Sequence, residues 1–106
     1  MLERSLQIKQ QMGDRIETAT GLLHVAEYLA RRGSSAAAAR LIGAFEAMAE
    51  EIGGAEPWVA RMREDTLGVV REKLADGEVD SEREQGRKLP IDKAVDFALA
   101  ALEGLR

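Results

Sequence analysis

The sequence predicts an all-α fold made of antiparallel helix pairs, and three observations carry this prediction. Apolar residues recur at i, i+3 and i+4 over several stretches of three to four turns. Glycine or proline stands between most of these stretches, where helices stop and start. No long alternation of Val, Ile and Thr indicates a β-strand. Because the predicted linkers are short, successive helices should lie antiparallel.

Two predicted helices cover about the first third of the chain, and glycines mark their ends. A thin apolar stripe predicts a first helix over roughly 2–12, closed by Gly13, with Asp14 as a plausible cap for the next. The second helix, over 15–32, has the clearest periodicity and ends at Gly33. Its apolar positions are Ile16, Ala19, Leu22, Leu23, Ala26, Leu29 and Ala30.

The third helix should begin at a cap supplied by Ser34 or Ser35 and end at the Gly53-Gly54 pair. Its apolar positions again have a period of 3.6 residues: Ala38, Leu41, Ile42, Phe45, Met48, Ala49 and Ile52.

Three further segments complete the chain. Pro57 suits the first turn of a fourth helix, which we expect to end at Asp76-Gly77. Residues 78–88 are the most charged run, and both a short helix and a solvated loop fit them. Pro90 precedes a last helix with a dense apolar stripe, closed by Gly104.

Composition limits the kind of protein this can be. A chain of 106 residues predicts one domain, and with 45% hydrophobic but only 4% aromatic residues its core should consist of Ala, Leu, Ile, Val and Met. The net charge of −4 disfavours direct nucleic-acid binding, which needs a basic surface. The absence of cysteine fits a cytoplasmic protein, and no apolar run is long enough to span a membrane.

A repeat pattern is visible in the second and third predicted helices. Gly33 ends one helix and Ala38 follows five positions later, the spacing at which tetratricopeptide helices cross. Leu22, Val25, Ala26 and Leu29 fall where that signature has its Trp, Leu, Gly and Tyr. The chain therefore resembles a tetratricopeptide-like right-handed superhelix. In that frame 1–13 is the second helix of an incomplete repeat, 14–54 a repeat helix pair, and 55–106 C-terminal capping helices.

A more specific resemblance extends over nearly the whole chain. The segments 39–44, 46–48 and 52–53 are similar to the last repeat of large bacterial transcriptional regulators, the LuxR-type and maltose-regulator-like signal-transduction ATPases. In that family a charged helix, a Gly-Arg-x-Leu segment and an Ala/Leu-rich helix follow. Here they correspond to 61–74, 86–89 and 91–102.

The resemblance implies a non-catalytic protein–protein interaction or signal-relay module, either a C-terminal fragment of a regulator or a short stand-alone relative. Its partner would be a protein, a peptide or other domains of the parent regulator. Neither a nucleotide-binding loop nor a helix-turn-helix is present, so ATPase and DNA-binding activity are not assigned. The alternative is a purely structural C-terminal cap or homodimerisation domain without a ligand.

One polar stripe is the candidate binding site. Thr20, His24, Glu27 and Arg31 lie three or four residues apart and share one helix face. In the repeat frame these positions face the concave groove in which such scaffolds hold peptides. The alternative is an ordinary solvated face with a Glu27–Arg31 ion pair.

Catalytic and cofactor sites find no support in the sequence. His24 and Glu27 have a spacing used in metal sites, but one such pair does not make a site. The acidic run from Asp76 lacks the Gly and Glu that an EF-hand loop requires. No serine lies in a Gly-x-Ser-x-Gly context, and no phosphate-binding loop is present. We therefore expect no cofactor and no enzymatic activity.

Overall fold

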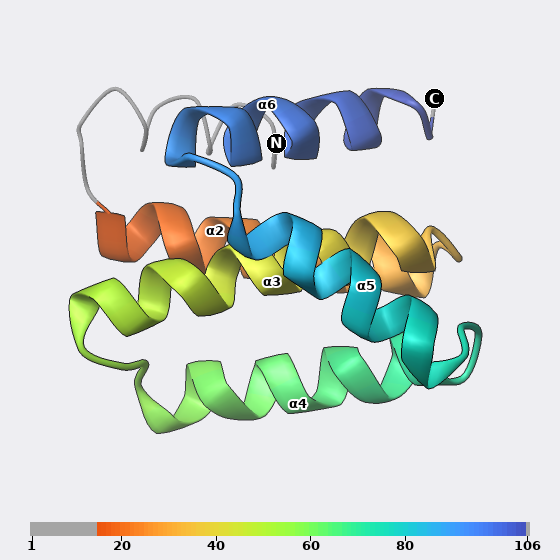
Figure 1. The fold of residues 1–106 in the computed structure, drawn as a ribbon, viewed down its shortest axis with the longest axis horizontal. Helices are drawn as coiled ribbons and strands as arrows, with labels where there is room; N and C mark the ends of the chain where they lie inside the picture. The colour runs from red at the N-terminus through yellow and green to blue at the C-terminus, as the bar shows by residue number, and fades with distance from the viewer. Residues whose placement is uncertain (1–14, 106) are drawn as a thin grey trace.

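The computed structural model describes residues 15–105, so the helix predicted over 2–12 and the partial repeat assigned to 1–13 lie outside the described residues. Five helices follow one another (Figure 1): α2 (Arg15–Arg31), α3 (Ser35–Ile52), α4 (Pro57–Arg71), α5 (Asp76–Arg87) and α6 (Ile91–Glu103). Within 15–105 there is no β-strand, and the all-α prediction is confirmed. The tetratricopeptide-like superhelix stays a prediction.

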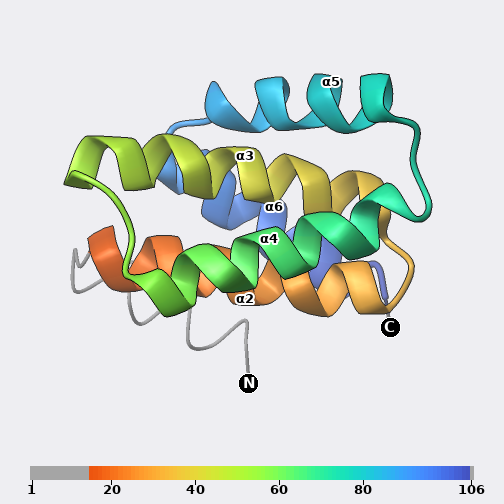
Figure 2. The same ribbon diagram turned by 90° about the horizontal axis from the view of Figure 1, so that it is seen from below.

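Helix α3 lies at the centre of the fold. It packs against α2 on one side and α5 on the other, and it also contacts α4 and α6 (Figures 1 and 2). Helices α4 and α6 lie on opposite sides of the α2/α3 pair. The middle of α3 is therefore surrounded by neighbouring helices, which explains why α3 is buried from Leu41 to Glu46 without interruption.

The turn between α2 and α3 sets this pair antiparallel. Gly33 adopts a left-handed backbone with φ of 88°, and the Ser34 amide donates to the Leu29 carbonyl oxygen at 2.9 Å. Ser34 occupies the predicted cap position of α3, but its side chain makes no capping hydrogen bond. The hydroxyl oxygen of Ser35 is buried and has no hydrogen-bond partner. Ser34 therefore stands at the predicted position, but neither serine caps the helix through its side chain, and the predicted capping hydrogen bond is wrong.

The core is aliphatic, as the composition predicts. Its largest fully buried side chains come from all five helices: Leu22, Leu23, Leu29, Leu41, Ile42, Leu67, Val25, Val70, Val79 and Val95. Phe45 is the one buried aromatic residue of the described chain.

A glycine contact brings α3 and α5 together at their backbones. A Cβ atom built on Gly43 would lie 2.0 Å from the carbonyl oxygen of Arg83, and one on Gly86 would lie 1.8 Å from that of Arg40. Both distances are far below contact, so each helix accepts the backbone of the other only because it has glycine there. This contact, together with the buried Val79, docks a helix that is otherwise charged.

The boundary between α4 and α5 differs from the sequence prediction. Helix α4 ends at Arg71, and Asp76 and Gly77, predicted to end it, form the first turn of α5. Asp76 and Glu78 are acidic residues in that first turn, where they complement the helix dipole. The charged run is therefore a helix, and the solvated-loop alternative is wrong.

Two apolar residues assigned to buried stripes are exposed. Ile16 is 60% exposed and Ile52 is 37% exposed. Ile16 lies in the first turn of α2 and Ile52 is the last residue of α3, so each lies at the end of its helix. Periodicity placed them on the correct faces but cannot indicate where the covering helix stops.

A candidate protein-docking groove

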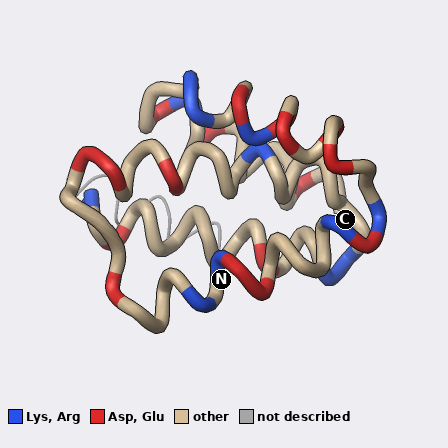
Figure 3. Tube along the Cα trace, turned by 60° about the horizontal axis from the view of Figure 1, so that its bottom comes forward, with Lys and Arg blue, Asp and Glu red and all other residues tan. Residues whose placement is uncertain are grey.

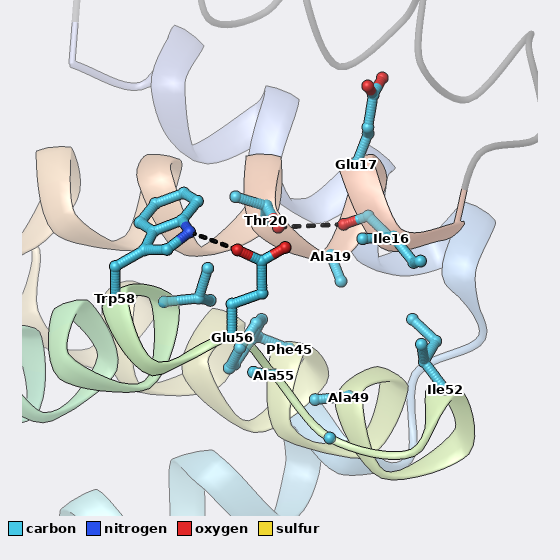
Figure 4. Close-up of a pocket in the computed structure, with 12 residues that line it drawn as sticks. Ile16, Glu17, Ala19, Thr20, Phe45, Ala49, Ile52, Ala55, Glu56 and Trp58 are labelled. Carbon is cyan, nitrogen blue, oxygen red and sulfur yellow. Dashed lines mark hydrogen bonds between the residues drawn. The ribbon is translucent and has the colours of Figure 1, made fainter.

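An apolar groove opens where the start of α2, the end of α3 and the start of α4 meet (Figure 4). Its volume is about 400 Å³, in the range of ligand-binding clefts. The residues that line it are Ile16, Glu17, Ala19, Thr20, Phe45, Ala49, Ile52, Gly54, Ala55, Glu56, Trp58 and Val59.

Exposed apolar side chains gather at this groove. The described residues have four large hydrophobic side chains that are exposed, and three of them, Ile16, Ile52 and Trp58, line it. The Trp58 side chain, the largest of the three, is 51% exposed. Soluble monomers expose contiguous apolar patches rarely, and such patches mark interaction sites.

Local sequence explains how these side chains come to lie together. Gly53 and Gly54 take positive φ values of 105° and 119° and turn the chain sharply after Ile52. Glu56 then has an extended backbone and Pro57 opens α4, which directs Trp58 toward α2. The loop thus sets the end of α3 and the start of α4 around one hollow.

Few polar groups point into the groove. The Trp58 indole N–H donates to Oε2 of Glu56 at 2.8 Å, which fixes the ring at one side of the groove. The Thr20 hydroxyl donates to the Ile16 carbonyl oxygen at 3.0 Å, inside its own helix. These two bonds satisfy the polar donors and leave an apolar floor formed by Ala19, Phe45, Ala49 and Val59.

The four residues of the predicted polar stripe on α2 lie beside different parts of α4. Thr20 lines the groove, and the ring of His24 stands 6.5 Å from the ring of Trp58 at its edge. Glu27 and Arg31 form the predicted ion pair, at 3.7 Å, and lie beside Asp65 and Thr66 of α4. From Thr20 to Arg31 the helix rises by about 16 Å. The four residues therefore do not surround one site.

Sequence reasoning missed the groove because Ile16, Phe45 and Ile52 were assigned to the apolar stripes of their helices. A signal was present, since the single tryptophan follows a Gly-Gly turn and a proline, outside any apolar stripe.

A cluster of charges lies on the other side of the α3–α4 loop, between α3, α4 and α5. The side chain of Glu46 is 10% exposed and accepts from Arg63 at 2.7 Å and from Arg83 at 2.6 and 3.1 Å. Hydrogen bonding to Glu46 is the main cause that raises the pKa of Arg83 above its ordinary value. Arg63 also pairs with Glu64.

Two more ion pairs continue this arrangement along the α3–α5 seam. Arg40 donates to Glu82 at 2.9 Å and to Gln85 at 2.8 Å, and Arg87 donates to Glu50 at 2.7 Å. Figure 3 shows acidic and basic residues interleaved along the chain. Each arginine of the seam has a carboxylate partner. We therefore interpret these ion pairs as contacts that hold α5 against α3, and not as an anion-binding site.

Within residues 15–105, no three His, Cys, Asp or Glu side chains are grouped so as to hold a metal ion. None of the five helices is both long and apolar enough to cross a bilayer.

Comparison of the chain with protein-family models, with curated proteins and with solved structures finds no match.

Proposed function

We propose that this chain is a non-catalytic protein-interaction module whose docking site is the groove between α2, α3 and α4. The observation that carries the proposal is the gathering of Ile16, Ile52 and Trp58, three of the four exposed large apolar side chains described, around one hollow. Tryptophan is enriched among the residues that dominate binding at protein interfaces, and Trp58 is half-exposed at this groove.

The lining favours a protein partner over a small molecule. Small-molecule sites combine an apolar wall with several convergent polar groups. Here the indole N–H and the Thr20 hydroxyl are satisfied within the protein, so few groups are left to orient a ligand. An apolar side chain from a partner needs no such orientation, because burial of its surface supplies the free energy.

The resemblance to bacterial transcriptional regulators supplies a context for this module. It supports a cytoplasmic signal-relay role in which the partner is a peptide, another protein or a further domain of the same regulator. The parallel course of α2 and α4 in Figure 2 is compatible with a tetratricopeptide-like stack, in which the first helices of successive repeats run side by side.

A peptide-display selection tests the proposal. Wild-type protein should enrich peptides that lose at least about tenfold in affinity for Ile16→Asp, because a carboxylate in the groove must be desolvated on binding. Ile16 is mostly exposed, so this variant should keep the wild-type circular dichroism and melting temperature. A selection whose peptides bind Ile16→Asp as well as wild type would overturn the groove assignment.

The polar stripe provides the matched control. Glu27→Ala and Arg31→Ala change charged residues on the same helix but away from the groove. Peptides that dock in the groove should bind both variants with unchanged affinity. If these two variants abolish binding while Ile16→Asp does not, the docking site is the stripe.

The purely structural cap without a ligand makes the opposite prediction. For such a cap, repeated selections should give no peptide whose binding depends on Ile16 or Trp58. The same outcome would exclude the proposed docking function.

A further inference from the structure

The junction between α4 and α5 lacks the residues that usually end one helix and begin the next. The turns after α2 and α3 are closed by Gly33 and Gly53, both in left-handed conformations. At the end of α4, Glu72 keeps a right-handed helical backbone, with φ of −70° and ψ of −22°. Ala75 stands at the N-cap of α5, where an alanine has no side-chain acceptor to offer. The chain therefore breaks here with neither a glycine stop nor a capping side chain.

The residues of this junction favour a helix. Glu72, Lys73, Leu74 and Ala75 all belong to the residue types with the highest helix propensity. The backbone N–H groups of Lys73 and Leu74 each donate to the Val70 carbonyl oxygen at 3.0 Å, so the chain still coils after α4 ends. Ala75 has a helical φ of −66° and departs from a helix only through its ψ of 152°.

The part of the chain beyond this junction packs on helices that precede α4. Helix α5 lies mainly against α3, and α6 lies against α2 and α3, whereas α5 makes few contacts with α4. Only the loop 72–75 joins α5 and α6 covalently to the first three described helices (Figure 1). The same contacts can therefore form when α5 and α6 come from a second copy of the chain, because the surfaces that meet are identical.

We propose that two copies of this chain exchange α5 and α6, with residues 57–87 of each copy forming one continuous helix. Such a helix would be about 46 Å long. Straightening the junction gives intrahelical partners to groups that helix ends leave unpaired. One of them is the N–H of Ala75, which donates to no backbone carbonyl of residues 15–105.

Concentration decides between the monomer and the exchanged dimer. In the monomer the short loop 72–75 keeps α5 beside α3 at an effective concentration in the mM range. Asp76 and Glu78 also favour the break, because they complement the dipole at the start of α5, an end that the continuous helix does not have. We therefore expect exchange when the chain folds at about 1 mM, and monomer when it folds at about 10 μM.

Refolding from urea at these two concentrations tests the exchange, since α5 and α6 must leave their own copy before they can join another. Size-exclusion chromatography with light scattering should then give the mass of one chain, 11.6 kDa, after dilute refolding. Concentrated refolding should add a fraction of twice that mass. Ile16→Asp should leave this fraction unchanged, because the exchange does not use the groove.

Two adjacent substitutions should change the dimer association constant in opposite directions. Ala75→Pro suits the φ of the monomer but interrupts the continuous helix in both copies, so the constant should fall at least about a hundredfold. Asp76→Ala removes a side chain that favours the break and adds a better helix former, so the constant should rise about tenfold. Gly68→Ala, a position inside α4 and helical in both forms, should leave it unchanged.

Several results would overturn the exchange. One is the absence of a dimer after concentrated refolding, and another is an equal dimer fraction for Ala75→Pro and wild type. If Ala75→Pro loses the wild-type circular dichroism, Asp76→Ala decides, and an unchanged dimer fraction for that variant excludes a hinge that straightens. A dimer that Ile16→Asp abolishes is held by the groove and not by exchange. None of these results bears on the docking function, which the display selection tests with monomeric protein.

Discussion

A methyl group at position 43 or 86 has no space in this molecule. At both positions the added Cβ would overlap a backbone carbonyl of the facing helix, at 2.0 Å and 1.8 Å respectively. Backbone atoms cannot rotate away as the end of a long side chain can, so α3 and α5 would have to separate. The surrounding ion pairs between Arg40, Glu46 and α5 depend on the same close approach.

Gly43→Ala and Gly86→Ala should each lower the free energy of unfolding by about 3 kcal/mol, at the upper end of overpacking effects. The matched control is Gly68→Ala, in the middle of α4, where the added Cβ meets nothing within 4 Å. That change should raise stability by about 0.5–1 kcal/mol through helix propensity. Urea unfolding of the three variants measures whether the free energy of unfolding falls or rises in each. A Gly43→Ala variant more stable than wild type would contradict the close approach of α3 and α5.

Glu46 is the residue on which two arginines converge. Replacing it with glutamine keeps the shape but leaves Arg63 and Arg83 half-buried with a weaker acceptor. We expect a loss of about 2 kcal/mol, below the value for fully buried pairs because both arginines keep contact with solvent. Glu72→Gln, on an exposed residue, should change stability by less than about 0.5 kcal/mol in the same measurement.

The raised pKa of Arg83 has a defined consequence for pH dependence. A cation whose pKa is higher in the folded state stabilises the fold at every pH below its unfolded value, and the effect is lost only as the pH rises through the folded value. For an arginine that window lies in strong alkali. The Arg83–Glu46 bond should therefore give no change of stability between about pH 6 and pH 9 through Arg83.

Among the elements, α5 depends most on charge. Val79 and Gly86 are its only buried residues, and three arginine–carboxylate contacts link it to α3. Half-exposed pairs weaken as salt screens them. Amide hydrogen exchange in α5 should accelerate at about 1 M NaCl more than exchange in α3, whose contacts are mainly apolar. Equal acceleration in both helices would show that the ion pairs do not hold α5.

The helices differ in how well the sequence predicts them, and the reasons are physical. Helices α2 and α3 could be predicted because long apolar stripes and glycine stops report local geometry directly. The boundary between α4 and α5 was missed because Asp76-Gly77 suits a helix end and a helix start equally well. The docking of α5 through two glycines depends on residues distant in the chain, which periodicity does not report.

The candidate site was also predicted only in part. Thr20 and His24 were predicted and lie at the groove or its edge, whereas Ile16 and Ile52 were assigned to apolar stripes and Trp58 was not predicted as a site residue. Their exposure depends on where α4 begins and how the Gly53-Gly54 loop turns. Only the placement of three helix ends relative to one another turns apolar stripe residues into a groove.

For the whole molecule, the net charge of −4 opposes self-association, and we therefore expect a monomer. Size-exclusion chromatography with light scattering should give the mass of one chain, 11.6 kDa, at concentrations up to about 100 μM. A homodimer that Ile16→Asp dissociates would identify the groove as a self-association surface and favour the homodimerisation domain considered from the sequence.

The two glycines of the α3–α5 contact also form a signature by which distant relatives of this chain can be sought. A sequence that keeps the helix pattern but places larger residues at both positions cannot bring these two helices as close. Conversely, a glycine near the middle of a helix that matches α3, together with one near the end of a charged helix that matches α5, would indicate the same packing even where few other residues agree. The pair therefore gives a criterion for this helix packing that overall sequence identity does not contain.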